Sequence, residues 1–125
     1  MGGPLCAVKN VITESKTRSV EPGITVVEIS GRLTLGNSLQ SLETSVRRLI
    51  EDGSRKLIFD LAGLDSVDSA GLGMLIGANG LMEQSGGKVR ISGAHGSVAK
   101  ILGVVHLDRL MALDPDCATA CGKLA

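Results

Sequence analysis

The sequence predicts an α/β fold: one domain with a mixed, mostly parallel sheet of four to five strands, an N-terminal β-hairpin and three to four helices. Two observations lead to this prediction. Short apolar runs typical of strands alternate with longer segments in which apolar residues recur every three or four positions. The resulting order is hairpin, helix, strand, helix, strand, helix, strand, which fits parallel strands joined by right-handed crossovers.

The hairpin is predicted to occupy the first quarter of the chain. Its strands are expected at Val8–Thr13 and Ile24–Ile29, which are rich in β-branched residues, and a Pro-Gly pair typical of a turn lies between them. In the second strand Val27 and Ile29 should share one face of the sheet. Residues 1–6 are expected to be a tail.

The first helix is predicted to begin at Asn37, which with Gln40 forms a plausible N-terminal capping pair. Gly53 stands where a left-handed residue commonly ends a helix. The spacing of the apolar residues between them predicts a single buried stripe. Its members are Leu39, Leu42, Val46, Leu49 and Ile50.

Residues 57–59, Leu-Ile-Phe, predict a central strand that is covered on both faces and ends at Asp60. A loop is expected over 61–68, followed by a second helix from Ser69 to about Ser85, which Gly86-Gly87 ends. Loops at the carboxyl ends of strands carry functional residues in α/β sheets, so the start of this helix is where we expect the site.

The remaining elements are expected to be short. A strand is predicted at Val89–Ile91, a third helix capped by Ser97, and a last strand at Leu110–Leu113. The whole chain, 1–125, should then be one domain with its core over 8–113. Residues 114–125 would form a weakly patterned tail.

Composition excludes several classes of function. Lys plus Arg and Asp plus Glu each number 13, and Phe59 is the only aromatic residue, so a nucleic-acid partner is not expected. No apolar run approaches the ~20 residues of a membrane span. The N-terminal residues lack the pattern of an export signal, and three cysteines fit a reducing compartment, so we expect a cytoplasmic protein.

The second helix contains three glycines on one narrow stripe, Gly73, Gly77 and Gly80. Each costs about 1 kcal/mol relative to alanine, so some compensating role is expected. The stripe could let the helix lie close against the sheet, which is the interpretation we favour. It could instead give the helix, which is apolar nearly all round, a flat face for a partner protein.

Ser69 also has two interpretations. A serine at the start of a helix is most often a structural cap. The same position suits a phosphate, because free backbone N–H groups and the helix dipole both favour negative charge there. Asp68 would oppose that phosphate modestly, but could help to position the hydroxyl for a kinase.

The segment Asp68-Ser69-Ala70-Gly71-Leu72-Gly73, after a strand that ends in Asp60-Leu61, resembles the signature of STAS domains, in particular the bacterial anti-sigma-factor antagonists. Gly31-Arg32-Leu33 is similar to the family's Gly-x-Leu after the second strand. The resemblance extends over about 8–113.

The resemblance implies a regulator that is not an enzyme and needs no cofactor. Its partner would be an anti-sigma factor that is also a serine kinase, which phosphorylates Ser69 and which the unphosphorylated protein binds, freeing a sigma factor. A metal-dependent serine phosphatase would be a further partner. A STAS scaffold in a sensory or transport complex is the alternative. The residues expected to bind the partner are Asp68, Ser69, Ala70, Leu72, Gly73, Ile76 and Thr34.

Thr34 departs from the family pattern, because many members carry an acidic residue directly after Gly-x-Leu. This puts in question any partner contact that uses that carboxylate. Thr34 and Ser66 are therefore secondary candidates for phosphorylation, ranked below Ser69.

Other chemistry is less well supported by the sequence. Cys117 and Cys121 have helical spacing, but the two histidines are distant in sequence, so a zinc site is not expected. A serine hydrolase would use Ser69 with His95 or His106 as base, yet the first glycine of G-x-S-x-G is absent. The carboxylates Asp60, Asp65 and Asp68 could hold a hard cation, although a solvated loop is the commoner explanation.

Overall fold

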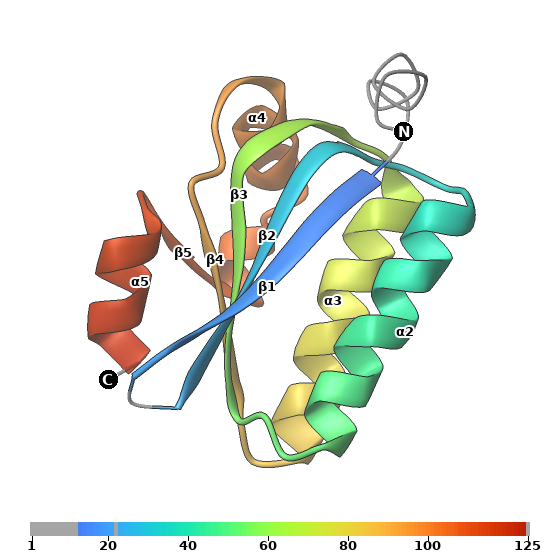
Figure 1. Cartoon of the computed structure of the whole chain (residues 1–125). Helices are drawn as coiled ribbons and strands as arrows, with labels where there is room; N and C mark the ends of the chain where they lie inside the picture. The colour runs from blue at the N-terminus through green and yellow to red at the C-terminus, as the bar shows by residue number, and fades with distance from the viewer. Residues whose placement is uncertain (1–12, 22, 125) are drawn as a thin grey trace, which may run out of the picture.

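Five strands form one mixed sheet whose order follows the chain, β1-β2-β3-β4-β5 (Figure 1). The structure, a computed structural model, describes residues 13–21 and 23–124. β1 (Thr13–Val20) is antiparallel to β2 (Ile24–Leu33). β3 (Lys56–Val67), β4 (Lys88–Ser92) and β5 (Ala112–Asp114) continue the sheet in parallel. The predicted fold class is confirmed.

The parallel strands are joined by α2 (Asn37–Glu51), α3 (Ser69–Gln84) and α4 (Gly96–Val104), the last followed by the 3₁₀ turn η2 (Leu107–Arg109). Figure 1 shows α2 and α3 side by side along one face of the sheet and α5 (Cys117–Leu124) on the opposite side. The sheet therefore needs an apolar surface on both faces.

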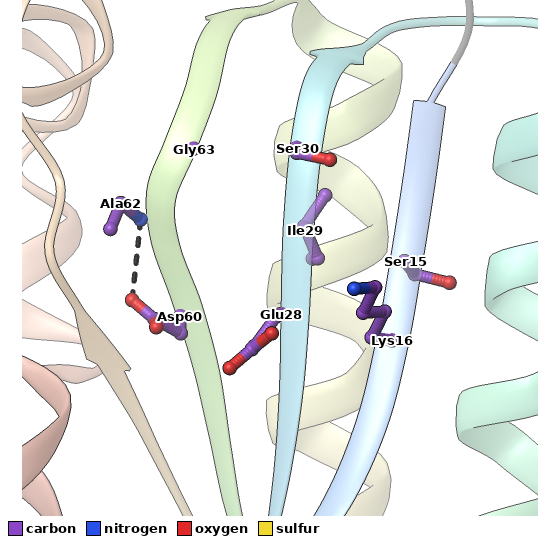
Figure 2. A pocket seen from close by; sticks show the side chains of 8 residues that line it. All are labelled: Ser15, Lys16, Glu28, Ile29, Ser30, Asp60, Ala62 and Gly63. Atoms are coloured by element: carbon purple, nitrogen blue, oxygen red, sulfur yellow. Dashed lines mark hydrogen bonds between the residues drawn. The ribbon is translucent and has the colours of Figure 1, made fainter. Parts of the chain in front are cut away.

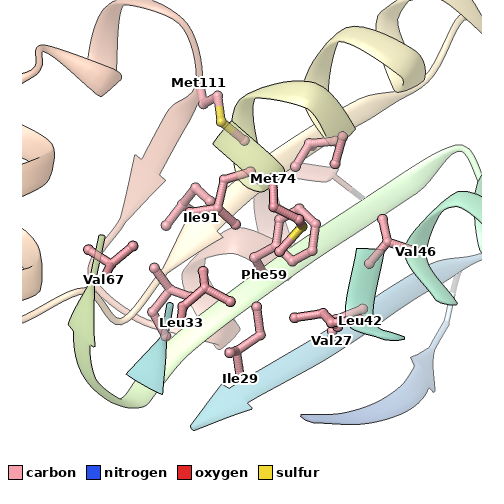
Figure 3. Packing of buried hydrophobic residues seen from close by; sticks show 14 of the residues in the cluster. Val27, Ile29, Leu33, Leu42, Val46, Phe59, Val67, Met74, Ile91 and Met111 are labelled. Carbon is pink, nitrogen blue, oxygen red and sulfur yellow. The ribbon is translucent and has the colours of Figure 1, made fainter. Parts of the chain in front are cut away.

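The larger core lies between the sheet and α2, α3 and α4. It includes Val27 and Ile29 from one face of β2, as predicted, and Figure 3 shows Phe59 and Met74 within the same cluster. The stripe predicted for α2 is also confirmed: Leu39, Leu42, Val46 and Ile50 are buried, and Leu49 packs against them partly buried.

A second, smaller core lies under α5. Ile24, Val26 and Ile58 on the other face of the sheet pack against Ala120 and Leu124. The prediction of a weakly patterned tail at 114–125 is therefore wrong, because most of this segment is a helix that covers apolar strand residues. An ion pair between Arg90 and Asp114, at 2.6 and 3.1 Å, joins β4 to the short β5 beside it.

The first strand is not where the sequence predicted it. Residues 8–12 of the expected strand, like the expected tail 1–6, lie outside the described part of the chain, and the strand paired with β2 is Thr13–Val20. Its register brings Val20 opposite Ile24 across the turn. Residues 15–19 are exposed because β1 is an edge strand, so apolar alternation could not reveal it.

β3 continues for seven residues beyond the expected end at Asp60, so the predicted loop at 61–68 is wrong. Leu61, Leu64 and Val67 are buried on the extended strand. Their spacing of three arises because β3 gains one residue relative to β2 at each of two irregularities in the pairing. Those bulges interrupt the alternation by which a strand is normally recognised.

Two of the predicted helix caps are also wrong. α2 is preceded by Gly36 and α4 by His95, and neither helix start has a side-chain cap; Asn37 and Ser97 already lie inside their helices. The predicted C-terminal ends of the helices agree better with the structure. Gly53 after α2 and Gly86 after α3 adopt positive φ, +107° and +83°.

Candidate functional site

The start of α3 is capped by Asp68. Its Oδ1 accepts a hydrogen bond from the Gly71 N–H at 2.9 Å, which makes Ser69 the first residue of the helix. The interpretation of Ser69 as the structural cap is therefore wrong. Ser69 is exposed, and among the described residues none is hydrogen-bonded to its hydroxyl. That hydroxyl is accessible for chemistry.

The same aspartate joins α3 to the connection 34–36 between β2 and α2. Asp68 Oδ2 accepts a hydrogen bond from the Leu35 N–H at 3.0 Å, and the Asp68 N–H donates to the Leu33 carbonyl at 3.2 Å. These bonds favour the charged carboxylate: the Leu35 N–H first, and then the Gly71 N–H, lower the pKa of Asp68 below its ordinary value.

Gly71 is the glycine that allows close packing at this site. A Cβ atom at this position would lie 2.1 Å from the Leu33 carbonyl oxygen, so only glycine fits without a shift of the backbone. The start of α3 therefore lies directly on the end of β2. Together with the bonds of Asp68, this contact fixes Ser69 relative to the connection 34–36.

The three glycines that were predicted to pack on the sheet do not do so. Added Cβ atoms at Gly73, Gly77 and Gly80 would meet nothing within 4 Å, and the first two glycines are exposed. The interpretation that we favoured is wrong, and the stripe faces outward. Ile76 and Leu81 on the same helix are 40% and 37% exposed, so this outer face is small and apolar.

A hollow of about 220 Å³ lies beside this face, between α2 and α3. Glu43 and Arg47 of α2 give it one charge of each sign. The complete lining comprises Glu43, Val46, Arg47, Met74, Gly77, Ala78 and Leu81.

The other predicted site residues lie around the same helix start. Thr34 is half-buried in the connection after β2, whereas Ala70 and Leu72 pack partly buried against the larger core. Sequence reasoning missed Leu35, which is 75% exposed. A single leucine in a loop takes part in no periodic pattern, so no sequence signal could have singled it out.

Comparison with known proteins decides the family. The model of the STAS domain matches residues 15–120 of this chain. The chain belongs to the STAS domain family. The matched range includes all of α3 and the first half of α5, so the C-terminal helix begins within the STAS domain.

Solved structures with the STAS fold are similar over most of this chain. An anti-sigma factor antagonist from Mycobacterium paratuberculosis is 20% identical, with a TM-score of 0.78 over 90% of this chain and 93% of that one. The Bacillus cell fate determinant SpoIIAA in its phosphorylated form is 18% identical, with a TM-score of 0.73 over 90% of this chain and 100% of that one. The murine anion transporter Slc26a9 is 16% identical, with a TM-score of 0.71 over 97% of this chain but 23% of the transporter.

Neither histidine of this STAS domain is placed to activate Ser69. His95 Nε2 lies 2.8 Å from the Ala62 carbonyl oxygen, and within the described part of the chain neither His95 nor His106 is hydrogen-bonded to Ser69. A serine nucleophile needs a base within hydrogen-bonding reach. The geometry therefore gives the hydrolase alternative no support.

The cysteines and carboxylates do not combine into a metal centre in residues 13–21 and 23–124, where no group of three or more His, Cys, Asp or Glu could hold an ion. Cys117 and Cys121 do share a face of α5, with their sulfurs 3.9 Å apart, and burial raises the pKa of Cys117. Asp60 instead accepts from the Ala62 N–H and the Ser92 hydroxyl.

A larger hollow, of about 710 Å³, lies on the face of the sheet that carries α5. Figure 2 shows Glu28 and Asp60 projecting into it from adjacent strands. Glu28 is paired there with Arg18 at 2.9 Å, so its charge is already balanced within the domain. The hollow is lined by Ser15, Lys16, Glu28, Ile29, Ser30, Asp60, Ala62 and Gly63.

No helix in the part of the chain that the structure describes is both long enough and apolar enough to cross a membrane.

Proposed function

We propose that this STAS domain is an anti-sigma-factor antagonist controlled by phosphorylation of Ser69. The unmodified protein binds an anti-sigma factor that is also a serine kinase, so that the sigma factor is freed and transcription changes. The observation that carries the proposal is the exposed Ser69 hydroxyl, unbonded within the described residues, beside the outward face of α3. The likeness to SpoIIAA in its phosphorylated form supports it.

Phosphorylation would act on this surface through charge and hydration. A phosphate adds about −1.5 to −2 charge at pH 7. The Ser69 position at the start of α3 tolerates that charge, because the helix dipole and the free N–H groups there attract it. Removing a phosphate from water against an apolar partner face is costly, however, and Asp68 adds a like charge. The modified protein should therefore fold normally but bind its partner weakly.

A direct test compares Ser69→Ala with Ser69→Asp. Each purified serine kinase of the anti-sigma class encoded in the source genome would be titrated with both variants by calorimetry. Ser69→Ala should bind as tightly as the wild type, and Ser69→Asp about tenfold or more weakly, a loss of about 1.4 kcal/mol. As a control, Ala99→Asp places the same charge at an exposed position near the start of α4 and should have no effect. Equal binding by the two Ser69 variants would refute the switch.

Reversal of the switch calls for a second enzyme. We propose that a metal-dependent serine phosphatase removes the phosphate from Ser69, which its exposed position would permit. The domain itself is proposed to act as a cytoplasmic binding module without catalytic activity.

The second candidate function is a STAS module within a transport assembly. It is favoured by the likeness to Slc26a9, in which a domain of this size makes up a minor part of a transporter. Under this function the charge at Ser69 is irrelevant, and Ser69→Asp would leave assembly with the transporter unchanged.

A further inference from the structure

Leu35 is the most exposed large apolar side chain in the described part of the chain, at 75%. It lies in the connection 34–36, between the end of β2 and the start of α2. A leucine at this position loses the favourable burial that it would have in a core. A specific contact with another molecule would account for its presence there.

The backbone of Leu35 is held in place rather than free. Its N–H donates to Asp68 Oδ2 at 3.0 Å, while Oδ1 of the same carboxylate caps α3 through the Gly71 N–H. The Asp68 N–H in turn donates to the Leu33 carbonyl, against which Gly71 packs. A side chain presented by a fixed backbone binds with a smaller loss of conformational entropy than one on a mobile loop.

We propose that Leu35 is an anchoring contact for the kinase that acts on Ser69, and that Asp68 is the positioning residue that holds it there. The inference rests on the proposed function. Leu35 and Asp68 are 33 positions apart in sequence, yet their hydrogen bond fixes Leu35 next to the residue that precedes Ser69. The kinase would therefore recognise two segments of the folded chain, with an apolar pocket for leucine beside its phosphate-transfer site.

Val104 provides a matched control. It is 71% exposed, aliphatic and at the end of α4, and it belongs to neither of the two segments that Asp68 joins. If Leu35 made only nonspecific hydrophobic contact, its truncation to alanine would change the affinity no more than the truncation of Val104. A leucine that fills a pocket should behave as an interface hot spot.

The experiment measures the affinity of Leu35→Ala, Val104→Ala and Asp68→Asn for each purified anti-sigma serine kinase of the source genome. Leu35→Ala should bind about tenfold or more weakly and Val104→Ala within about twofold of the wild type, with unchanged thermal unfolding. Asparagine retains one acceptor oxygen, so Asp68→Asn can cap α3 or hold Leu35 but not both as the carboxylate does. It should weaken binding and speed hydrogen exchange of the Leu35 N–H.

The outcomes separate this inference from the proposed function. If Leu35→Ala binds like the wild type while Ser69→Asp still weakens binding, the anchoring role is wrong and the switch stands. If none of these variants changes the affinity for any of the kinases, the proposed function fails and the inference fails with it. If Val104→Ala weakens binding to the same extent as Leu35→Ala, the specific role of Leu35 is also overturned.

Discussion

Asp68 is the residue on which the geometry of the site depends. One carboxylate receives an N–H from each of two segments, so it both begins α3 and fixes the connection after β2. Ser69 is left exposed because its neighbour already performs the capping role. A conservative substitution of Asp68 should therefore lower both the free energy of unfolding and the affinity for the partner.

The charge of Asp68 predicts that the free energy of unfolding depends on pH. Its pKa is lowered in the folded protein, so its stabilising contribution is present above the ordinary pKa of about 3.9 and is lost as pH falls through the lower folded value. At pH 7, Asp68→Asn should lower the free energy of unfolding by roughly 1 kcal/mol, the typical net value of one hydrogen bond, because the carboxylate is partly exposed.

Urea unfolding of both proteins from pH 7 down to pH 3 checks this prediction. The difference between wild type and Asp68→Asn should be constant down to about pH 5 and shrink below about pH 4. A difference that does not change across the series would show that the Asp68 charge contributes nothing to stability.

Capping was hard to predict because the sequence offers competing residues. Asp68 and Ser69 are both good N-cap residues, and only the point at which β3 ends decides between them. The same uncertainty placed caps at Asn37 and Ser97, one or two residues too late. The importance of the aspartate as a link to Leu35 depends on a contact 33 positions away, which local patterns do not contain.

At the scale of elements, α3 carries glycines of two kinds. Gly71→Ala should destabilise the protein by about 2 kcal/mol or more, because the new methyl group overlaps the Leu33 carbonyl oxygen. Gly77→Ala should stabilise it by up to about 1 kcal/mol, because that position is helical, exposed and free of neighbours within 4 Å.

Urea unfolding of the two variants tests this contrast, and circular dichroism would show that α3 remains helical in each. Equal destabilisation by both substitutions would mean that the stripe containing Gly77 is packed against the domain after all. If the stripe is part of the partner face, Gly77→Ala should also weaken kinase binding although it raises stability.

Helical spacing placed the three glycines of the stripe on one side of α3 correctly, but it could not say which side. An apolar helix has weak amphipathic contrast, so the outward face is decided by Gly71 and its contact with β2. The extension of β3 through Val67 was missed for a related reason, since two bulges change which residues share a face.

The whole molecule has two cores, and the role of the second, the packing of α5 on the sheet, can be tested by substitution. Ala120 is fully buried on the inner face of α5, whereas Ala118 on the same helix is exposed. Ala120→Gln should lower the free energy of unfolding by roughly 2–3 kcal/mol through overpacking and burial of an amide. Ala118→Gln should change it by less than about 0.5 kcal/mol. Equal stability of the two variants in urea would show that α5 does not cover the sheet.

The sequence was most informative about this overall architecture. Alternating strands and helices predicted a mostly parallel sheet, and the main-core residues Val27 and Ile29 of β2 and the buried stripe of α2 were identified from their spacing. The edge strand β1 was predicted too early in the chain, and the helix α5 was missed. β1 is an exposed, polar edge strand, and α5 spans only eight residues, of which two side chains are buried.

The measurement that tests the central claim most directly compares the unphosphorylated protein with the phosphorylated protein. The chain would be phosphorylated by each candidate kinase with ATP, the modified residue located by mass spectrometry, and the affinities of both states for that kinase measured in one buffer. We predict a single phosphate on Ser69 and binding at least about tenfold weaker than that of the unmodified protein. A phosphate at another residue, or unchanged affinity when Ser69 carries it, would contradict the account.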